Sequence, residues 1–256
     1  MLNERSVISW FSCGAASAIA TWIALKENAA NIRIIYIDTG SEHEDNRRFL
    51  QECSTWFGRE IEECKSLDYD SVDDVISKRK FINSPQGAPC SLFLKKRVRQ
   101  RVEDLDAVQV FGYTADKADK KRAERFALAN SEVITRFPLI EHGITKQDCL
   151  AILHSKDIEI PAMYLLGYQN NNCIGCVKGG IGYWNKIRID FPTVFNRRAA
   201  QEREVGHSIL KDKNGPIWLD ELAPERGNIL NDPDFSCSLL CESFVAGEHP
   251  QHAERP

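Results

Sequence analysis

Several features that mark familiar classes of protein are missing from this chain of 256 residues. It contains no signal peptide and no apolar run long enough to cross a bilayer, so we expect a cytoplasmic protein without a membrane partner. Its net charge of −4 is a poor match for a surface that grips duplex nucleic acid, because neutralising phosphates takes clustered Lys and Arg. The six histidines are scattered, so a hydrolase built on a Ser-His-Asp triad is not indicated.

What is present is an ordinary globular composition, 43% hydrophobic and 27% charged, in a chain long enough for one α/β core and an added C-terminal region. Apolar, β-branched runs alternate with amphipathic segments. Strands are expected at 6–11, 32–37, 60–64, 107–113 and 132–136. Helices are expected at 17–28, 43–57, 71–79, 90–105, 117–130 and 145–155. This alternation predicts an α/β fold with a doubly wound parallel sheet.

The regular alternation ends near Asp157. We therefore expect an α/β domain over 1–156, a cysteine-containing C-terminal region over 157–246 and a disordered tail over 247–256. Within the C-terminal region, residues 168–182 are rich in Asn, Gly and Cys. The segment 182–188 and a helix over 193–206 are expected to complete a lid.

The loop after the first expected strand is the most informative motif. It joins the apolar run 7–11 to a helical pattern through six residues: Ser12, Cys13, Gly14, Ala15, Ala16 and Ser17. Backbone N–H groups and the positive end of the helix dipole converge in such a loop, and small residues let an oxyanion approach the main chain. No Gly-Lys-Ser/Thr follows the glycine, so this is not a Walker A loop.

The second expected strand ends in Asp38, Thr39 and Gly40, where the carboxyl end of a parallel strand meets a ligand crevice. His43 follows closely and is a further candidate. The pair of motifs, Ser-x-Gly-x-x-Ser and Asp-Thr-Gly, resembles the PP-loop ATP pyrophosphatases. Within them it is similar to the phosphoadenylylsulfate (PAPS) reductase-like branch, also called adenine nucleotide alpha-hydrolases, and this resemblance implies their fold.

The family loop usually reads Ser-Gly-Gly-x-Asp-Ser, so Ser12, Gly14 and Ser17 match while Cys13 and Ala16 depart. Binding of pyrophosphate by backbone amides survives both changes, because it depends on the direction of the N–H groups. Ala16 stands where the family places an acidic residue. Any role of that carboxylate in ordering a metal must therefore be filled elsewhere or be absent.

A third segment, Cys-Ser-x-x-Leu-Lys from Cys90 to Lys95, is similar to the element that places a cysteine and a lysine at the mouth of the family's site. The resemblance also implies that Gly112, Tyr113 and Arg122 contact the nucleotide. A basic strip either steers a phosphate-bearing substrate or is a solvated helix face; it comprises Lys95, Lys96, Arg97, Arg99 and Arg101.

The nine cysteines fall into two groups. Those at 53, 64 and 149 lie in amphipathic patterns and are expected to be small buried hydrophobes. The others include two short-range pairs, Cys173 with Cys176 and Cys237 with Cys241, whose spacing suits thiolate coordination of Zn or a [4Fe–4S] cluster. A redox pair at 173 and 176 is the competing interpretation. The resemblance implies a [4Fe–4S] cluster held by Cys90, Cys173, Cys176 and either Cys237 or Cys241, with the remaining cysteine carrying sulfur.

The resemblance implies an ATP pyrophosphatase that uses ATP with Mg²⁺ to adenylylate an acceptor, after which sulfur displaces AMP. The implied sulfur donor is a cysteine desulfurase or a cluster-bound sulfide. The implied acceptor is a DNA backbone phosphate, as in DNA phosphorothioation, or a tRNA base, reached through partner proteins. Two alternatives stay open. One is a sulfonucleotide (PAPS/APS) reductase, although Cys241 is followed by Glu242 and Ser243 rather than by that enzyme's Gly-x-His. The other, motivated by Ala16, is a non-catalytic nucleotide-binding scaffold.

Overall fold

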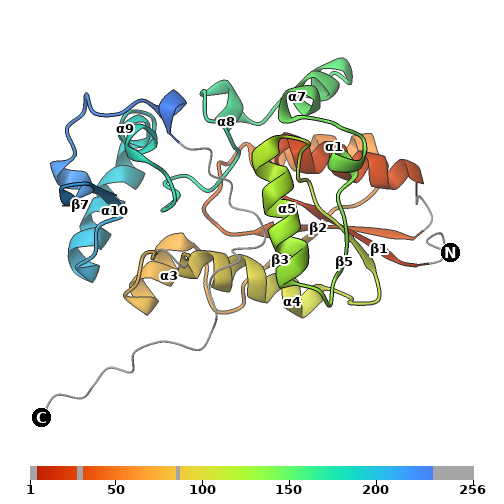
Figure 1. Ribbon diagram of the computed structural model, residues 1–256, viewed down its shortest axis with the longest axis horizontal. Helices are drawn as coiled ribbons and strands as arrows, with labels where there is room; N and C mark the ends of the chain where they lie inside the picture. Colours follow the sequence, from red (N-terminus) through yellow and green to blue (C-terminus); the bar gives the residue numbers. More distant parts are fainter. Residues whose placement is uncertain (1–4, 28–30, 85–86, 233–256) are drawn as a thin grey trace, which may run out of the picture.

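The computed structural model describes residues 5–27, 31–84 and 87–232. Its centre is a parallel five-stranded sheet with the strand order β3-β2-β1-β4-β5 (Figure 1). The strands are β1 (Val7–Phe11), β2 (Ile32–Asp38), β3 (Glu62–Lys65), β4 (Val108–Val110) and β5 (Ile134–Arg136). The chain winds outward from β1 to β3 and then returns to the other side of β1, which confirms the predicted doubly wound fold.

Helices cover both faces of the sheet, which is why every residue of β1 is apolar or small and buried. On one face α1 (Ala15–Glu27), α2 (Asn46–Phe57) and α7 (Lys146–Ser155) pack around Phe11, Phe49 and Leu153. On the other face α4 (Arg97–Val102) and α5 (Lys117–Ala129) pack through Val98 and Phe126 against Trp10. Burial of these apolar side chains is the main force holding the layers together.

The order of the strands reverses at β1, which pairs with β2 through Phe11↔Tyr36 and with β4 through Ser9↔Val110. In open parallel sheets, ligands bind beyond the carboxyl ends of the strands at such a reversal. Here the segment after β4 also approaches α1 very closely, because a Cβ on Gly112 would lie 2.7 Å from Ser17 Cα. The close approach places the loops that follow β1 and β4 side by side.

The expected strand 107–113 is therefore too long, since the chain leaves the sheet after Val110 to meet α1. The expected helix 90–105 is present as a π-helical turn η1 (Ser91–Lys96) followed by α4. The expected helix 71–79 is α3 (Val72–Arg79), which begins where the Ser71 side chain accepts a hydrogen bond from Asp74 N at 3.2 Å.

Beyond the short helix α6 (Pro138–Glu141) and α7, the chain forms a helical region with an apolar cluster around Trp184, Phe195 and Leu219. Its elements are α8 (Ala162–Leu165), α9 (Ile181–Asp190), α10 (Pro192–Val205), β6 (Leu210–Asp212), β7 (Gly215–Ile217), η2 (Leu219–Glu221) and η3 (Ile229–Asn231). The expected helix 193–206 is α10. The tail predicted over 247–256 lies outside the described residues, and none of the described helices is long and apolar enough to span a membrane.

Two glycines with left-handed backbone angles allow the cost of backbone strain to be measured apart from the cost of a steric clash. Gly40 (φ 65°) and Gly58 (φ 59°) share a conformation, but a Cβ on Gly40 would lie 1.9 Å from the Asp70 carbonyl oxygen, whereas nothing lies within 4 Å at Gly58. We expect Gly58→Ala to lower the free energy of unfolding by about 1 kcal/mol. Gly40→Ala should lower it by about 1 to 3 kcal/mol more, because the turn after β2 must shift. Urea unfolding measures both, and equal losses would contradict the packing of this turn.

Candidate functional site

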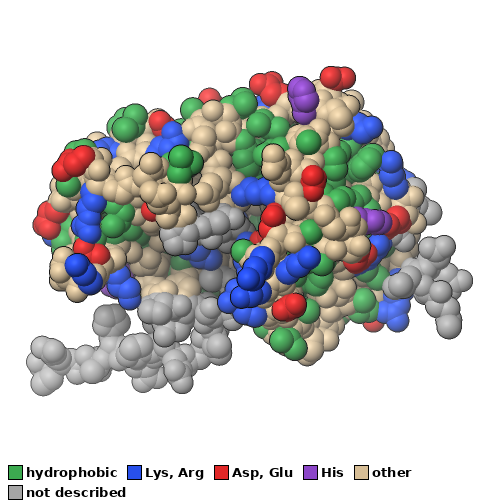
Figure 2. Space-filling model, turned by 45° about the horizontal axis from the view of Figure 1, so that its top comes forward, with side chains coloured by type: hydrophobic (Ala, Val, Ile, Leu, Met, Phe, Trp, Pro, Cys, Tyr) green, Lys and Arg blue, Asp and Glu red, His purple; other side chains and the backbone are tan. Residues whose placement is uncertain are grey.

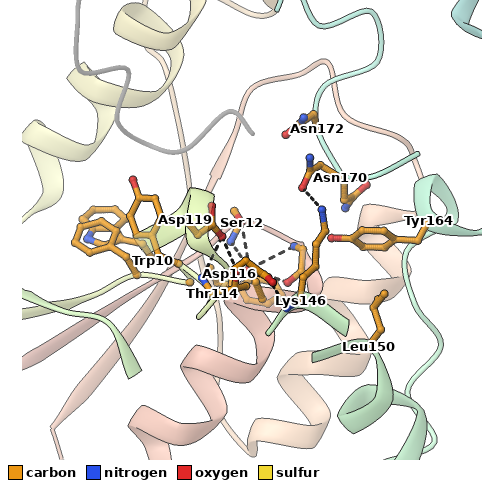
Figure 3. Close-up of a pocket in the computed structure, with 18 of the residues that line it drawn as sticks. Trp10, Ser12, Thr114, Asp116, Asp119, Lys146, Leu150, Tyr164, Asn170 and Asn172 are labelled. Atoms are coloured by element: carbon orange, nitrogen blue, oxygen red, sulfur yellow. Dashed lines mark hydrogen bonds between the residues drawn. The ribbon is translucent and has the colours of Figure 1, made fainter. Parts of the chain in front are cut away.

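A cavity of about 460 Å³ lies beyond the carboxyl ends of β1, β2 and β4 (Figure 3). Its volume suits a small-molecule ligand. Aromatic side chains, with Trp10 among them, line one side, and Lys146, Asn170 and Tyr164 face it from the other. The predicted crevice is therefore present, and residues from six separate stretches of the chain line it: 10–17, 36–42, 95, 111–119, 146–150 and 164–173.

The loop after β1 is held by the Ser17 hydroxyl, which accepts a hydrogen bond from Ser12 N at 3.0 Å and donates one to Gly14 O at 2.9 Å. Ser12, Gly14, Ala16 and Ser17 line the cavity. The first turn of α1 begins there, so backbone N–H groups that lack helical partners lie beside the cavity. This arrangement can bind an anion such as a phosphate group.

Cys13 differs in chemistry from the glycine usual in the resembled family, but its backbone takes a conformation that glycine favours. Its φ of 57° is left-handed, a conformation that favours glycine, which is the residue the family places there. The thiol is fully buried beneath the loop, and this burial raises its pKa well above the ordinary value. Cys13 and Ala15 do not line the cavity, so any contact from Cys13 to a ligand would come from its backbone.

Of the residues after β4 that were predicted to contact the nucleotide, two line the cavity and one does not. Gly112 and Tyr113 line the cavity, as predicted for nucleotide contacts. Arg122 does not line it, because its guanidinium is bound to Asp119 at 2.7 Å and lies over the Tyr113 ring, 5.4 Å from its centre. The structure therefore gives Arg122 a supporting place behind Tyr113.

The residues at the end of β2 that were expected to meet the ligand crevice, Asp38, Thr39 and Gly40, lie outside the cavity. Asp38 forms an ion pair with Arg47 at 2.8 Å, and Gly40 packs against Asp70; neither residue lines the cavity. Thr39 is buried, and its hydroxyl lies 3.1 Å from the Cys173 sulfur. The ring of His43 packs edge-on against Phe191, away from the cavity.

Charged groups that sequence reasoning did not single out for the site also line the cavity. Lys146 donates to Asn170 Oδ1 at 2.8 Å (Figure 3). Glu42 accepts a hydrogen bond from the Thr39 hydroxyl at 2.6 Å; burial raises the pKa of this carboxyl, and the nearby Lys95 opposes the shift. Two lysines and the N-terminus of α1 thus border a cavity that Glu42, Asp116 and Asp119 also line, and the end of the cavity at α1 suits an anionic group.

The predicted basic strip does not form one surface. Lys95 lines the cavity, whereas Arg99 is fully buried and pairs with Glu103 at 2.7 Å. Arg101 donates to the Lys65 carbonyl at 2.7 Å. Lys and Arg side chains do gather near the middle of the face in Figure 2. Helical spacing alone could not show which of these cations turns inward.

Three of the predicted metal ligands converge. Cys90, Cys173 and Cys176 line a second, much smaller cavity of about 10 Å³. Lys95 and Cys173 line both this cavity and the larger one, so the two share a wall. The cysteines of the described residues are all thiols. Cys53 and Cys149 are buried in the core as predicted, whereas Cys64, on the edge strand β3, is only partly buried.

The three thiols of the small cavity are suitable ligands for a metal or cluster, but the volume of the cavity is too small to hold a cluster. About 10 Å³ is roughly the room for one water molecule. In the described part of the chain no three His, Cys, Asp or Glu side chains are placed to hold a single metal ion. A larger group would have to part the side chains that close the cavity. Cys237 and Cys241 lie outside the described residues.

A buried cation lies near these thiols. Arg198 is 2% exposed and pairs with Asp73 at 3.1 Å. Burial lowers the pKa of its guanidinium, while Asp73 and the sulfurs of Cys90 and Cys176 oppose the shift. A positive charge at this place favours thiolates over thiols.

The Cys-x-x-Cys turn is built around Tyr183. Its hydroxyl accepts a hydrogen bond from Cys176 N at 2.9 Å and donates one to Cys173 O at 3.3 Å. Gly175 takes a φ of 68° in the turn, where a Cβ would lie 2.6 Å from Val194 Cγ1. Ile174 N donates to Ser41 O at 2.8 Å, which attaches the turn to the loop after β2.

Comparison with known proteins agrees with the predicted family. Residues 6–179 match the phosphoadenosine phosphosulfate reductase domain. An uncharacterized protein of Methanocaldococcus jannaschii is 24% identical over 220 residues, which are 81% of this chain and 45% of that protein. The chain thus spans less than half the length of this relative. Among solved structures, the U34-tRNA thiolase NcsA of Methanococcus maripaludis, with its [4Fe–4S] cluster, gives a TM-score of 0.45 at 13% identity, covering 80% of this chain and 74% of that one.

The Tyr183 hydroxyl can be tested against a second buried tyrosine. Tyr183→Phe leaves the buried Cys176 N–H without its acceptor, so the free energy of unfolding should fall by about 1 to 3 kcal/mol. Tyr168→Phe removes a bond to Asp190, which retains an ion pair with Lys186, so its loss should be about 1 kcal/mol or less. Urea unfolding of both variants decides the matter. A loss no larger for Tyr183→Phe than for Tyr168→Phe would show that the hydroxyl does not hold the turn.

Proposed function

Because the chain belongs to the phosphoadenosine phosphosulfate reductase domain family, whose members handle nucleotides and sulfur, we propose that it is an ATP pyrophosphatase that activates an acceptor for sulfur transfer. One observation carries the proposal. The large cavity beside the loop from Ser12 to Ser17, here called the phosphate loop, and the small cavity lined by Cys90, Cys173 and Cys176 share Lys95 and Cys173. An activated acceptor and a sulfur-bearing group would then meet at one wall.

ATP would place its phosphates on the loop between Ser12 and Ser17, with the two cavity lysines balancing their charge. This leaves the apolar part of the cavity, lined by Trp10, Ile37 and Phe111, for the adenine ring. The carboxylate of Asp116 lies in the same lining and would be offered to the accompanying Mg²⁺, where Ala16 provides none, whereas both oxygens of Asp119 are held by Thr114 and Arg122.

The proposed reaction has two displacements. An acceptor oxygen attacks the α-phosphorus of ATP and pyrophosphate leaves; sulfur then displaces AMP from the adenylylated acceptor. Lys95, whose side chain is nine-tenths buried, would offset the negative charge that develops on the α-phosphate. Its effect is strengthened by the low dielectric of its surroundings.

Cys90, Cys173 and Cys176 would hold an iron–sulfur cluster, because three thiols that line one cavity are the donors such a cluster takes. When bound, it would supply iron and sulfide at the wall shared with the nucleotide cavity. Arg198 would offset the negative charge of the coordinating thiolates. Residues such as Thr39 and Val177 would have to move apart to admit it.

The donor and the acceptor are proposed from the same chemistry. The terminal sulfur of a persulfide from a cysteine desulfurase would displace AMP to give an acceptor joined to the donor by a disulfide, and a second thiol would cleave that disulfide by exchange to release the thiolated product. The acceptor would be a DNA backbone phosphate or a tRNA base, presented by partner proteins, since the net charge of −4 does not favour binding of nucleic acid by this chain alone.

Reduction of a sulfonucleotide is a second candidate, favoured by the match to the phosphoadenosine phosphosulfate reductase domain. It would use the same anion-binding loop with PAPS in place of ATP. Purified protein incubated with ATP and tRNA or DNA, and separately with PAPS and a thiol reductant, distinguishes the candidates. Pyrophosphate supports the first proposal and sulfite the second, whereas ATP binding with neither product, also in the presence of the partner proteins, supports a nucleotide-binding scaffold.

The loop itself is tested by a pair of variants. A methyl group at Gly14 would meet Tyr164 Oη at 3.4 Å, an ordinary contact, so Gly14→Ala should bind ATP nearly as well as the wild type. Gly14→Val adds bulk where the phosphates would lie and should weaken ATP binding by about tenfold or more, a loss of about 1.4 kcal/mol. Calorimetric titration measures both affinities, and unfolding checks the fold. Unchanged affinity in Gly14→Val would remove the loop from the site.

A further inference from the structure

Two arginines lie against one aromatic ring on the surface formed by α3, η1 and the start of α4. The guanidinium carbon of Arg79 is 4.2 Å from the centre of the Phe93 ring, and that of Arg97 is 4.5 Å from the same centre. Both arginines are exposed, whereas Phe93 is 8% exposed. Because both distances are measured to one point, the two cations lie within about 9 Å of each other.

Within the described part of the chain, this arginine pair has no carboxylate partner. The nearby carboxylates bind other cations, in the ion pairs Asp74–Lys78, Glu204–Lys80, Asp73–Arg197 and Asp73–Arg198. Two further carboxylates, Asp68 and Asp70, precede α3, and Lys96 adds a cation beside Arg97. Two like charges are thus held close together without a counter-anion, an arrangement that favours the binding of an anionic group.

The ring of Phe93 belongs to η1, the turn that also reaches the wall shared by the two cavities. Lys95 lies two residues further along this turn and lines both cavities, and Cys90, which lines the small one, directly precedes the turn. One π-helical turn therefore supplies Lys95 to the shared wall and holds the arginine pair on the outer surface. Its continuation α4 and the neighbouring α3 lie along the lower side of the molecule in Figure 1.

Position, and not the ring contact itself, distinguishes this pair. Lys26 and Lys156 also lie over one ring, that of Trp22, at 3.8 and 5.5 Å from its centre. They lie at the C-terminal ends of α1 and α7, whose N-terminal ends border the large cavity. Cation–ring contacts stabilise both arrangements. The pair at Phe93 adjoins the shared wall, and the pair at Trp22 is remote from it.

We propose that Arg79 and Arg97 dock the phosphate backbone of an RNA loop, one of whose bases is the sulfur acceptor. This inference rests on the proposed function, in which the acceptor meets the nucleotide at the shared wall. Guanidinium groups suit phosphates, because each can donate two parallel hydrogen bonds to a pair of phosphate oxygens. Phosphate contacts of this kind position a nucleic acid without reading its sequence.

The recessed position of the shared wall favours an RNA loop over duplex DNA. Lys95 is 9% exposed and Cys173 is 5% exposed, so an acceptor atom must enter the protein to reach them. A base in an RNA loop can be splayed out of its strand and inserted, whereas the phosphates of a duplex stay on the outside of a stiff helix. The net charge of −4 also confines phosphate contacts to a short patch, which leaves partner proteins to add affinity.

Binding of RNA in the absence of ATP tests this surface. The probes are a fluorescently labelled tRNA and a labelled DNA duplex of similar length, each titrated by anisotropy over a range of KCl concentrations. The proteins are the wild type, the double variant Arg79→Gln/Arg97→Gln, the charge-retaining double variant Arg79→Lys/Arg97→Lys and the control Lys26→Gln/Lys156→Gln. The control removes two cations from the same kind of ring contact, so its net charge changes by the same amount.

The glutamine double variant should bind tRNA about tenfold more weakly than the wild type. Its plot of log Kd against log salt should be shallower by about 1.4, because each phosphate contact of a single strand contributes about 0.7 to the slope. The lysine double variant should keep the slope of the wild type, and the control at Trp22 should match the wild type in both affinity and slope. The wild type should bind the DNA duplex more weakly than tRNA.

Equal losses of tRNA affinity in the variants at Phe93 and Trp22 would overturn the inference, because net charge alone would explain them. Tighter binding of the duplex than of tRNA, or no binding of tRNA by the folded wild type, would overturn it as well. Urea unfolding checks the fold, and if the double variant does not fold, the single variants replace it with an expected slope change of about 0.7 each. The proposed function fails separately, through absence of pyrophosphate release from ATP, which the binding assay does not use.

Discussion

Two hydrogen bonds hold the segment 171–177, which carries Cys173 and Cys176, against the sheet. The lining of both cavities depends on these bonds, because residues of the segment line both. Asn171 Nδ2 donates to Cys13 O at 2.7 Å, and Ile174 N donates to Ser41 O at 2.8 Å. They attach the segment to the loops after β1 and β2, where the strand order reverses. Because the partners are far apart in sequence, the entropy lost on closing the chain must be offset by packing. Cys173 and Val177 provide it by joining the apolar cluster of α3 and η1.

Much of the core follows from local patterns in the sequence. The run 7–11 is apolar because both faces of β1 are covered, and the small residues after it can only serve a tight turn into a helix. Cys53 and Cys149 are buried because each lies on the apolar face of an amphipathic helix, α2 and α7 respectively. These features depend on neighbours within one or two turns, so their spacing was enough to predict them.

The parts of the site that escaped prediction depend on contacts between distant segments. Arg99 is one of five cations along η1 and α4, and only its contacts with Glu103 and Asn130 explain why it is buried. Asp38 ends β2, where a ligand-binding residue is expected, yet its carboxylate forms an ion pair with Arg47 outside the cavity. The Asn171 amide donates to two residues that are remote in sequence, Cys13 and Asn46. Sequence spacing does not encode such pairings.

The shared wall of the two cavities is tested most directly by alkylating the thiols with and without saturating ATP and following each cysteine by mass spectrometry. Cys173 lines both cavities, whereas the partly buried Cys64 lies on β3 and lines neither. If the nucleotide occupies the larger cavity, ATP slows the modification of Cys173 and leaves that of Cys64 unchanged. Equal rates for Cys173 with and without bound ATP would contradict the placement of the nucleotide beside the cysteines.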